Sequence, residues 1–299
     1  MNYKLILDIA FHLLRARLKQ TIVAAVGVTF SIAMFISLVS FMSGLNELLD
    51  GLMLNRTPHI RMYNEVKPSD NQPLSLSYEY KGNTGFIHSI KPKDRGKSIY
   101  NSMSIIRTLK QDKRVIDVAP KVTASVLFNS GTIEISGFVN GIDVVAENTL
   151  FMTSDYIKEG KLSDLNQNNS IIIGKGLSDK MLLSKGDIIK VSTSNGNLAS
   201  LKIVGISETG IADIDNMSSY TSLTTAQKLL GQPKNYITDI QVNLYNKELA
   251  VAMAKEFHTV FNLDTIDYLA ANVQFETGST VRSIISYTVG IVLLIVAGF

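Results

Sequence analysis

The sequence contains no cysteine and no tryptophan, and charged residues make up only 18% of its 299 positions. The lack of cysteine excludes a disulfide framework, a thiol nucleophile and any cysteine-ligated metal or iron–sulfur site. The near balance of 29 basic and 26 acidic residues, a net charge of +3, argues against a nucleic-acid binder that follows phosphates. Hydrophobic residues reach 45%, so the apolar excess must be concentrated in particular segments.

The first apolar segment lies near the N-terminus. No charged residue occurs from Gln20 to Asn46, and residues 21–42 read TIVAAVGVTFSIAMFISLVSFM. Because about 20 apolar residues in a helix span the hydrocarbon core of a bilayer, we predict a transmembrane helix over residues 20–43. A cleaved signal peptide is the alternative, but its apolar region is only about 7–15 residues long.

The residues before this span set its orientation. Residues 1–19 are predicted to form an amphipathic helix with one acidic residue, Asp8, and four basic ones: Lys4, Arg15, Arg17 and Lys19. Basic residues beside a span are retained on the cytoplasmic side of the membrane. We therefore expect the N-terminus to be cytoplasmic and residues 44–282 to lie on the opposite side.

A second apolar segment closes the sequence. Residues 283–299, SIISYTVGIVLLIVAGF, carry no charge and follow Arg282. As a helix this segment reaches only about 25 Å, less than the hydrocarbon core requires. A tail anchor is one interpretation. We expect instead the start of a second transmembrane helix in a longer membrane protein, of which this sequence is the N-terminal part.

Just beyond the first span, the segment LNELLDGLMLN continues a helical pattern. Its leucines recur at i, i+3, i+4 and i+7 and form one apolar face: Leu45, Leu48, Leu49 and Leu52. We predict that the membrane helix continues outward as a stalk and first strand over residues 44–63. The alternative is a short amphipathic helix lying on the membrane surface.

Residues 64–98 have the composition of a flexible, solvated loop. They hold three of the six prolines, and a strand is expected within them at LSLSYEY, residues 74–80. A basic cluster in this loop raises the alternative of an anionic partner, but a solvated loop face is the simpler interpretation of Lys91, Lys93, Arg95 and Lys97.

From residue 102 onward, short strands and helices alternate. Helices are predicted over 102–110, over SYTSLTTAQKLLG with Thr224 as N-cap and Gly231 after its end, and over LAVAMAKEFHTVF. Separate strands are predicted at VIDVAP, VTASVLF and TIEISGFVNGID, of which the last two are joined as a hairpin by the turn at 129–131. A second hairpin is predicted through the turn at 194–197. Since long strand–helix–strand spacing is missing, we predict an α+β fold, in which a two-lobed mixed α/β core domain occupies residues 64–282.

Motifs for catalysis are weak in this sequence. The four histidines, His12, His59, His88 and His258, show no metal-ligand spacing, and we interpret each as a surface or packed residue. Gly174-Lys175-Gly176 lacks the full phosphate-loop spacing, and the pair Asp213 and Asp215 lacks the glycine and glutamate of a calcium loop. We therefore expect no catalytic residue, no cofactor and no bound metal.

Small residues repeat along the first span. They recur every four residues and mark one helix face suited to close helix–helix packing in lipid: Thr21, Ala25, Thr29, Ala33 and Ser37. This pattern predicts a multi-helix bundle or a dimer, but it does not by itself identify a transporter.

The ordered series of motifs resembles the FtsX-like permeases of ABC transporters, and their lipoprotein-releasing (Lol-type) branch in particular. The resemblance rests on the basic helix before the span, the strand Pro58-His59-Ile60-Arg61-Met62 after the stalk, and the segments VIDVAPKV, GFVNGID, IIIGKGLSDKMLLSKGDIIKV and LKIVGISETGIADIDNMSSYTSL. The external region resembles the MacB-like periplasmic core domain. The match extends over most of the chain.

The resemblance implies a four-span permease subunit in the inner membrane with a periplasmic core domain. Its partners would be a cytoplasmic ABC ATPase dimer, a second permease subunit (as a homo- or heterodimer), lipoprotein or another amphiphilic cargo, and a periplasmic carrier. ATP hydrolysis in the separate ATPase would move the stalks and core domains. Leu45, Leu48 and Leu49 would then contact an acyl chain or pack against the partner subunit.

The hairpin VSTSNGNLASLKIV is short where the carrier-binding permeases have an extended hook, which argues against carrier capture through a hook.

Two alternatives to the permease stay open on the residues alone. A two-span receptor with an external sensor domain would share the same topology. An FtsX-like regulator that transmits force to a wall hydrolase is the third hypothesis.

Overall fold

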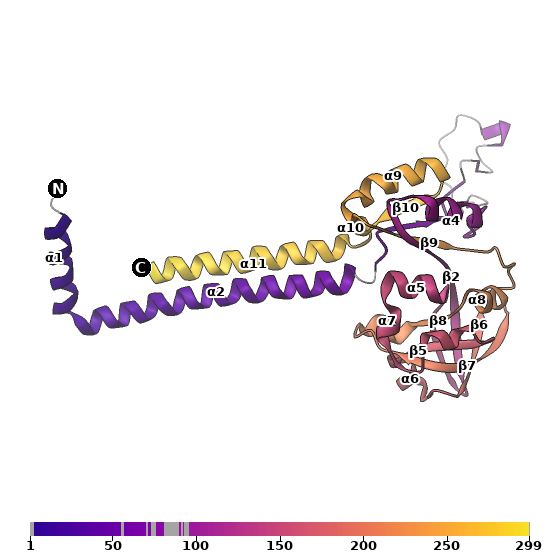
Figure 1. Cartoon of the computed structure of the whole chain (residues 1–299), viewed down its shortest axis with the longest axis horizontal. Coiled ribbons are helices and arrows are strands. Elements are labelled where there is room, and N and C mark those ends of the chain that lie inside the picture. The colour runs from indigo at the N-terminus through magenta and orange to yellow at the C-terminus, as the bar shows by residue number, and fades with distance from the viewer. Residues whose placement is uncertain are drawn as a thin grey trace. The chain divides into compact units, whose positions relative to one another are not determined.

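The computed structural model describes residues 3–54, 57–69, 71–72, 76–80, 90, 92 and 96–298 (Figure 1). The chain divides into two compact units. The helical unit comprises residues 1–54 and 272–299, and the core unit comprises residues 55–271.

The helical unit contains α1 (Tyr3–Ala16), α2 (Leu18–Leu54) and α11 (Val273–Gly298), of which α2 and α11 run side by side (Figure 1). Residues Leu18–Leu48 of α2, with a mean hydropathy of 2.5, are long and apolar enough to cross a membrane, and α2 alone passes this test within the described residues. The predicted span 20–43 lies inside this stretch. Since α2 continues unbroken to Leu54, the leucine segment belongs to the same helix as the apolar run.

The first lobe of the core unit is an antiparallel sheet covered by two helices. Its strands follow the order β10 (Asp264–Asp267), β1 (Ile60–Tyr63), β9 (Asp239–Leu244) and the first half of β2 (Val115–Ser130). Helices α4 (Ser102–Gln111) and α9 (Ala250–Phe261) pack on it. Helix α9 buries residues at i, i+3, i+4 and i+7: Ala250, Met253, Ala254 and Phe257.

The second lobe is a closed barrel that shares β2 with the first. From β2 the circuit runs through β3 (Ile133–Ile142), β8 (Ser218–Ser222), β5 (Ser170–Gly174), β7 (Leu198–Ser207) and β6 (Ile188–Thr193), and β6 pairs back with β2. Buried aliphatic side chains around Phe128 fill its interior. Short β4 (Ile157–Glu159) pairs with β7 outside this circuit. The α+β, two-lobed prediction is thus confirmed.

Short helices lie between these strands and after the last of them. They are α5 (Val144–Phe151), α6 (Lys175–Met181), α7 (Ala212–Met217), α8 (Leu223–Leu230) and α10 (Tyr268–Ala271), with 3₁₀ turns at Tyr78–Tyr80, Thr153–Tyr156, Leu162–Asn166 and Lys247–Leu249.

Three local predictions were wrong. Ser219–Ser222 lie in strand β8, where the start of a helix was expected. The N-cap of α8 is therefore Ser222 and not Thr224, and the Ser222 hydroxyl accepts a hydrogen bond from Thr225 N. Tyr78–Tyr80 form a 3₁₀ turn where a strand was expected. VIDVAP and VTASVLF were predicted as separate strands but form the single strand β2. Proline is tolerated at position 120 because β2 pairs there with β9 only, so no hydrogen bond to β3 requires the N–H that proline lacks.

Candidate functional site

One face of α2 packs along α11. Half-buried side chains recur on α2 at alternating spacings of four and three residues, as in a coiled-coil seam: Ser31, Phe35, Leu38, Met42 and Leu45. The ring of Phe35 lies directly on Gly290 of α11, where an added Cβ would stand 2.3 Å from Phe35 Cδ2. Glycine at this position therefore sets how closely the two helices approach.

A polar cluster joins the same helices at one end of the seam. Asn46 Nδ2 donates to Ser283 Oγ at 3.1 Å, and Arg282 Nε donates to Asn46 Oδ1 at 3.2 Å. One turn further along α11, Ser286 is buried and its hydroxyl has no hydrogen-bond partner within the described residues. Because polar groups in an apolar seam are matched at one alignment only, this cluster fixes the register of α2 against α11.

The predicted packing stripe faces away from this seam. Thr21 is half-buried, whereas Ala25, Thr29, Ala33 and Ser37 are exposed. Helical periodicity places Ala33 about 200° from Ser31 around the axis of α2. The structure thus does not bring the stripe to α11, and its packing against another helix stays a prediction. The seam itself was missed, although its four–three spacing was present in the sequence.

The predicted leucine face divides between two environments. Leu45 is half-buried on the side of α11, while Leu48 is 60% exposed. The side chains of Leu49 and Leu52 lie outside the described set. Leu48 therefore provides apolar surface beyond the α2–α11 seam.

Strand β1 is the entry point from α2 into the core unit, and β10 is the exit towards α11. In the sheet, β1 lies between β10 and β9, with Ile60 opposite Asp267 on one side and Val242 on the other. Arg61 Nε donates to Asp239 Oδ1 at 2.6 Å, and Lys67 pairs with Asp264 just beyond the strand. The two connections to the helical unit thus end on neighbouring, hydrogen-bonded strands.

His59 fastens the start of β1. The ring Nδ1 of His59 accepts a hydrogen bond from Leu244 N at 3.0 Å. The backbone N–H of His59 donates to Asn243 Oδ1 at 3.0 Å, and its backbone carbonyl oxygen accepts from Tyr268 N at 3.1 Å. Burial, followed by the positive charge of Lys247, lowers the pKa of the His59 imidazole. This histidine is a packed structural residue, as the sequence predicted.

Replacing His59 with alanine is expected to destabilise the core unit by about 1–3 kcal/mol, because it leaves the Leu244 N–H unpaired. The folded-state pKa of His59 lies below its ordinary value of 6.5. The neutral imidazole therefore makes its full contribution to the free energy of unfolding above pH 6.5, and this contribution is lost as the pH falls through the folded-state pKa. Thermal unfolding of the full chain in detergent, followed from pH 7.5 to 5, measures this. An alanine variant with an undiminished pH dependence would contradict the assignment.

The remaining sequence motifs have structural roles. A Cβ at Gly174 would lie 2.2 Å from Asp215 O, and one at Gly176 would lie 2.3 Å from Asn216 Oδ1, so these glycines allow α6 to pack against α7. Lys175 pairs with Asp179 of its own helix at 2.6 Å. The Gly-Lys-Gly motif is therefore a helix start, as expected from its incomplete spacing.

The acidic and histidine residues are likewise used in local contacts. Asp215 accepts from Thr209 N and Thr209 Oγ1 at 2.8 Å and from Gly210 N at 3.1 Å, while Asp213 lies in the first turn of the short α7. His258 Nδ1 lies 2.6 Å from Leu263 O, and His12 is exposed on α1. His88, Lys91, Lys93 and Arg95 lie outside the described residues. Among those described, no cluster of three or more candidate ligands could hold a metal ion.

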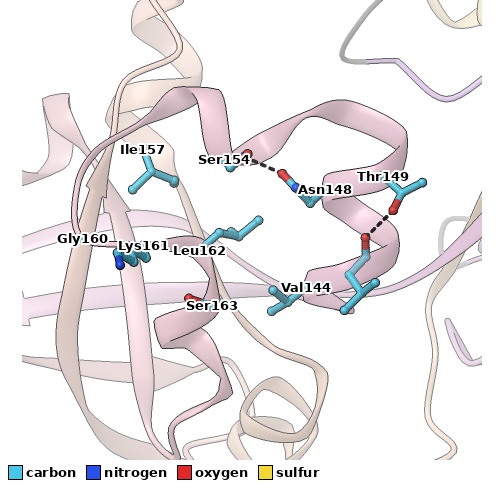
Figure 2. Close-up of a pocket in the computed structure, with 10 residues that line it drawn as sticks. Val144, Asn148, Thr149, Ser154, Ile157, Gly160, Lys161, Leu162 and Ser163 are labelled. Carbon is cyan, nitrogen blue, oxygen red and sulfur yellow. Dashed lines mark hydrogen bonds between the residues drawn. The ribbon is translucent and has the colours of Figure 1, made fainter.

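An open hollow of about 450 Å³ lies beside α5 (Figure 2). Its side chains bond locally: Asn148 Oδ1 accepts from Ser154 N at 2.9 Å, and Thr149 Oγ1 donates to Val145 O at 2.9 Å. Val144, Ile157 and Leu162 provide apolar surface, and Lys161 contributes the single charge of its described lining. These groups suit surface recognition rather than catalysis.

Most of the chain matches one known protein family. Residues 21–260 match the MacB-like periplasmic core domain, about four fifths of the chain. The chain belongs to this family. The MacB-like core-domain prediction is thus confirmed, and the match includes most of α2 as well as nearly all of the core unit.

Individual relatives are more distant. The chain is 24% identical over 245 residues to the lipoprotein-releasing system transmembrane protein LolC of Neisseria meningitidis serogroup B, a match over 78% of this chain and 51% of LolC. The chain thus spans about half the length of this curated relative. Among solved structures, the periplasmic region of MacB from Actinobacillus actinomycetemcomitans matches with a TM-score of 0.45 and 12% identity, over 74% of this chain and 94% of that one. The extracellular domain of the noncanonic ABC-type transporter YknZ from Gram-positive bacteria matches with a TM-score of 0.44 and 14% identity, over 69% of this chain and 100% of that one.

Proposed function

We propose that the protein is the transmembrane permease subunit of an ABC transporter that releases lipoproteins from the inner membrane. The membership of the MacB-like core-domain family and the similarity to LolC support this proposal. The proposed topology places α1 in the cytoplasm, the apolar part of α2 across the bilayer and the core unit on the periplasmic side. Helix α11 begins the second span.

The observation that carries the proposal is the pairing of β1 with β10. Helix α2 precedes β1 in the chain and α11 follows β10, and the two strands are hydrogen-bonded neighbours over Ile60–Tyr63. A movement that ATP binding imposes on the spans would therefore act on one pair of strands in the core unit. This arrangement suits a subunit that transmits force and leaves ATP hydrolysis to a separate ATPase dimer.

The same comparison supports the proposed partners. A second permease subunit, identical or related, would pack on the exposed stripe of α2, and an amphiphilic lipoprotein would contact apolar surface near Leu48. The β6–β7 hairpin has only residues 194–197 between its strands. Any periplasmic carrier would therefore have to bind elsewhere than on a hook at this hairpin.

Reconstitution tests this function. The full-length protein, its sister permease and its ATPase are placed in proteoliposomes that contain a fluorescently labelled triacylated lipoprotein. The proposal predicts release of the lipoprotein that requires ATP and is lost when the ATPase cannot hydrolyse it. ATP hydrolysis with the lipoprotein retained would point to another cargo or to a regulatory role.

A further inference from the structure

A second, more enclosed cavity lies inside the core unit where the two lobes meet. Its volume is about 200 Å³, and β2, β3, α5, β7, β8 and β9 all contribute to its wall. Most of the lining residues carry a polar group on the side chain, including Lys121, Asn140, Glu147 and Gln241. A polar cavity formed by so many elements differs from the open hollow beside α5.

Two buried acceptors in this cavity have no partner. Glu147 is 5% exposed and Gln241 is 7% exposed, and neither Glu147 Oε2 nor Gln241 Oε1 has a hydrogen-bond partner within the described residues. Burial raises the pKa of the Glu147 carboxyl, while the nearby charge of Lys121 opposes that rise. Since buried polar groups are almost always hydrogen-bonded, these oxygens point to a molecule that supplies donors.

Lys121 brings the opposite charge to the same cavity. Its backbone is held on both sides, because it pairs with Asp239 of β9 and with Ile142 of β3. Its ammonium group makes no hydrogen bond or ion pair within 4.0 Å among the described residues, so it is not neutralised by Glu147 directly. The cavity thus offers one negative and one positive group that do not satisfy each other.

We propose that this cavity binds a small zwitterion of the α-amino acid class. Its ammonium group contacts the Glu147 carboxylate and the Gln241 amide oxygen, and its carboxylate contacts the Lys121 ammonium. A simple cation would be repelled by Lys121, and a simple anion by Glu147. The cavity volume equals that of about six or seven molecules of liquid water. This space admits a small amino acid and excludes a folded peptide segment.

Binding is tested with the full chain in detergent and three probes: glycine, L-alanine and L-serine. Isothermal titration calorimetry at constant pH and ionic strength is expected to show saturable binding of at least one probe. Methylamine carries only the ammonium group and acetate only the carboxylate, so each should bind about tenfold more weakly or worse. This comparison separates a zwitterion site from a site for a simple ion.

Variants locate the binding. Glu147→Gln keeps the side-chain volume and removes the charge, and Lys121→Met does the same for the lysine; each should weaken binding about tenfold or more. The matched controls Glu134→Gln on β3 and Lys202→Met on β7, both exposed, should bind like the unmodified protein. Circular dichroism verifies that each variant is folded.

Two results would overturn the proposal. One is the failure of all three amino acids to bind the folded, unmodified protein up to about 10 mM, which would leave the cavity filled by water alone. The other is unchanged binding by folded Glu147→Gln or Lys121→Met. Neither result bears on lipoprotein release, because the site is independent of the transport proposal.

Discussion

Replacing Leu48 and Leu49 together with aspartate is expected to abolish ATP-driven release of lipoprotein while the protein stays in the membrane. Leu48 is exposed on α2 beyond the α2–α11 seam, where an acyl chain would need continuous apolar surface. Losing the burial of one leucine costs about 1.5–3 kcal/mol, roughly tenfold or more in affinity, and a carboxylate in its place adds a desolvation penalty. The proteoliposome release assay measures the effect.

Two control variants accompany this test. Leu48→Met with Leu49→Met keeps the surface apolar and should release lipoprotein normally. Glu47→Gln changes the charge of an exposed neighbour on the same helix and should also be active. Normal release by the double aspartate variant, inserted and folded, would show that this part of α2 does not contact the cargo.

Replacing Gly290 with valine is expected to separate α2 from α11. The added Cβ would lie 2.3 Å from Cδ2 and 2.5 Å from Cε2 of Phe35, a contact that the ring cannot accept without moving. Overpacking of this kind costs about 1–3 kcal/mol. Because the chain has no native cysteine, a pair can be introduced as Asn46→Cys and Ser283→Cys, at the positions where Asn46 Nδ2 and Ser283 Oγ lie 3.1 Å apart. The yield with a short bifunctional thiol crosslinker then reports helix pairing.

The same helix provides the matched control. At Gly278 an added Cβ would meet only Arg282 Nη1 at 3.5 Å, an ordinary contact, so Gly278→Val should leave the crosslink yield unchanged. Phe35→Ala should restore pairing in the Gly290→Val background by removing the ring. Equal yields for the two valine variants would contradict the close packing described for this seam.

Local patterns predicted the elements that depend on near neighbours. The turn at 129–131 joins β2 to β3, and Gly231 ends α8 with a φ of 66°, a conformation that glycine adopts without steric cost. The unbroken apolar run likewise predicted the membrane-length part of α2. In each case the residues that determine the structure lie within a few positions of one another.

Long-range pairings could not be predicted in this way. The place of β1 between β9 and β10 joins residues about 200 positions apart, and no motif in Ile60–Tyr63 specifies its partners. The closure of the barrel depends on β6 pairing with β2, which is also outside the reach of a periodicity argument. The packing face of α2 was predicted from its small residues. The observed α2–α11 seam lies on a different face and is formed by the larger residues around Phe35.

The polar cavity shows the same limit for a site. Lys121, Glu147 and Gln241 lie on three different elements, and each is unremarkable in its own segment. Their significance comes from burial without partners, which only the folded arrangement shows. The histidines, by contrast, were interpreted from the sequence as surface or packed residues, and His59 and His258 bond to the backbone.

Co-purification tests the proposal that the chain is a permease subunit driven by a separate ATPase. The tagged, full-length protein is isolated from detergent-solubilised membranes, and its partners are identified by mass spectrometry. A P-loop ATPase is expected in stoichiometric amounts together with a permease dimer. Recovery of a self-dimer without any ATPase would contradict the proposal and would favour a two-span receptor with an external sensor domain.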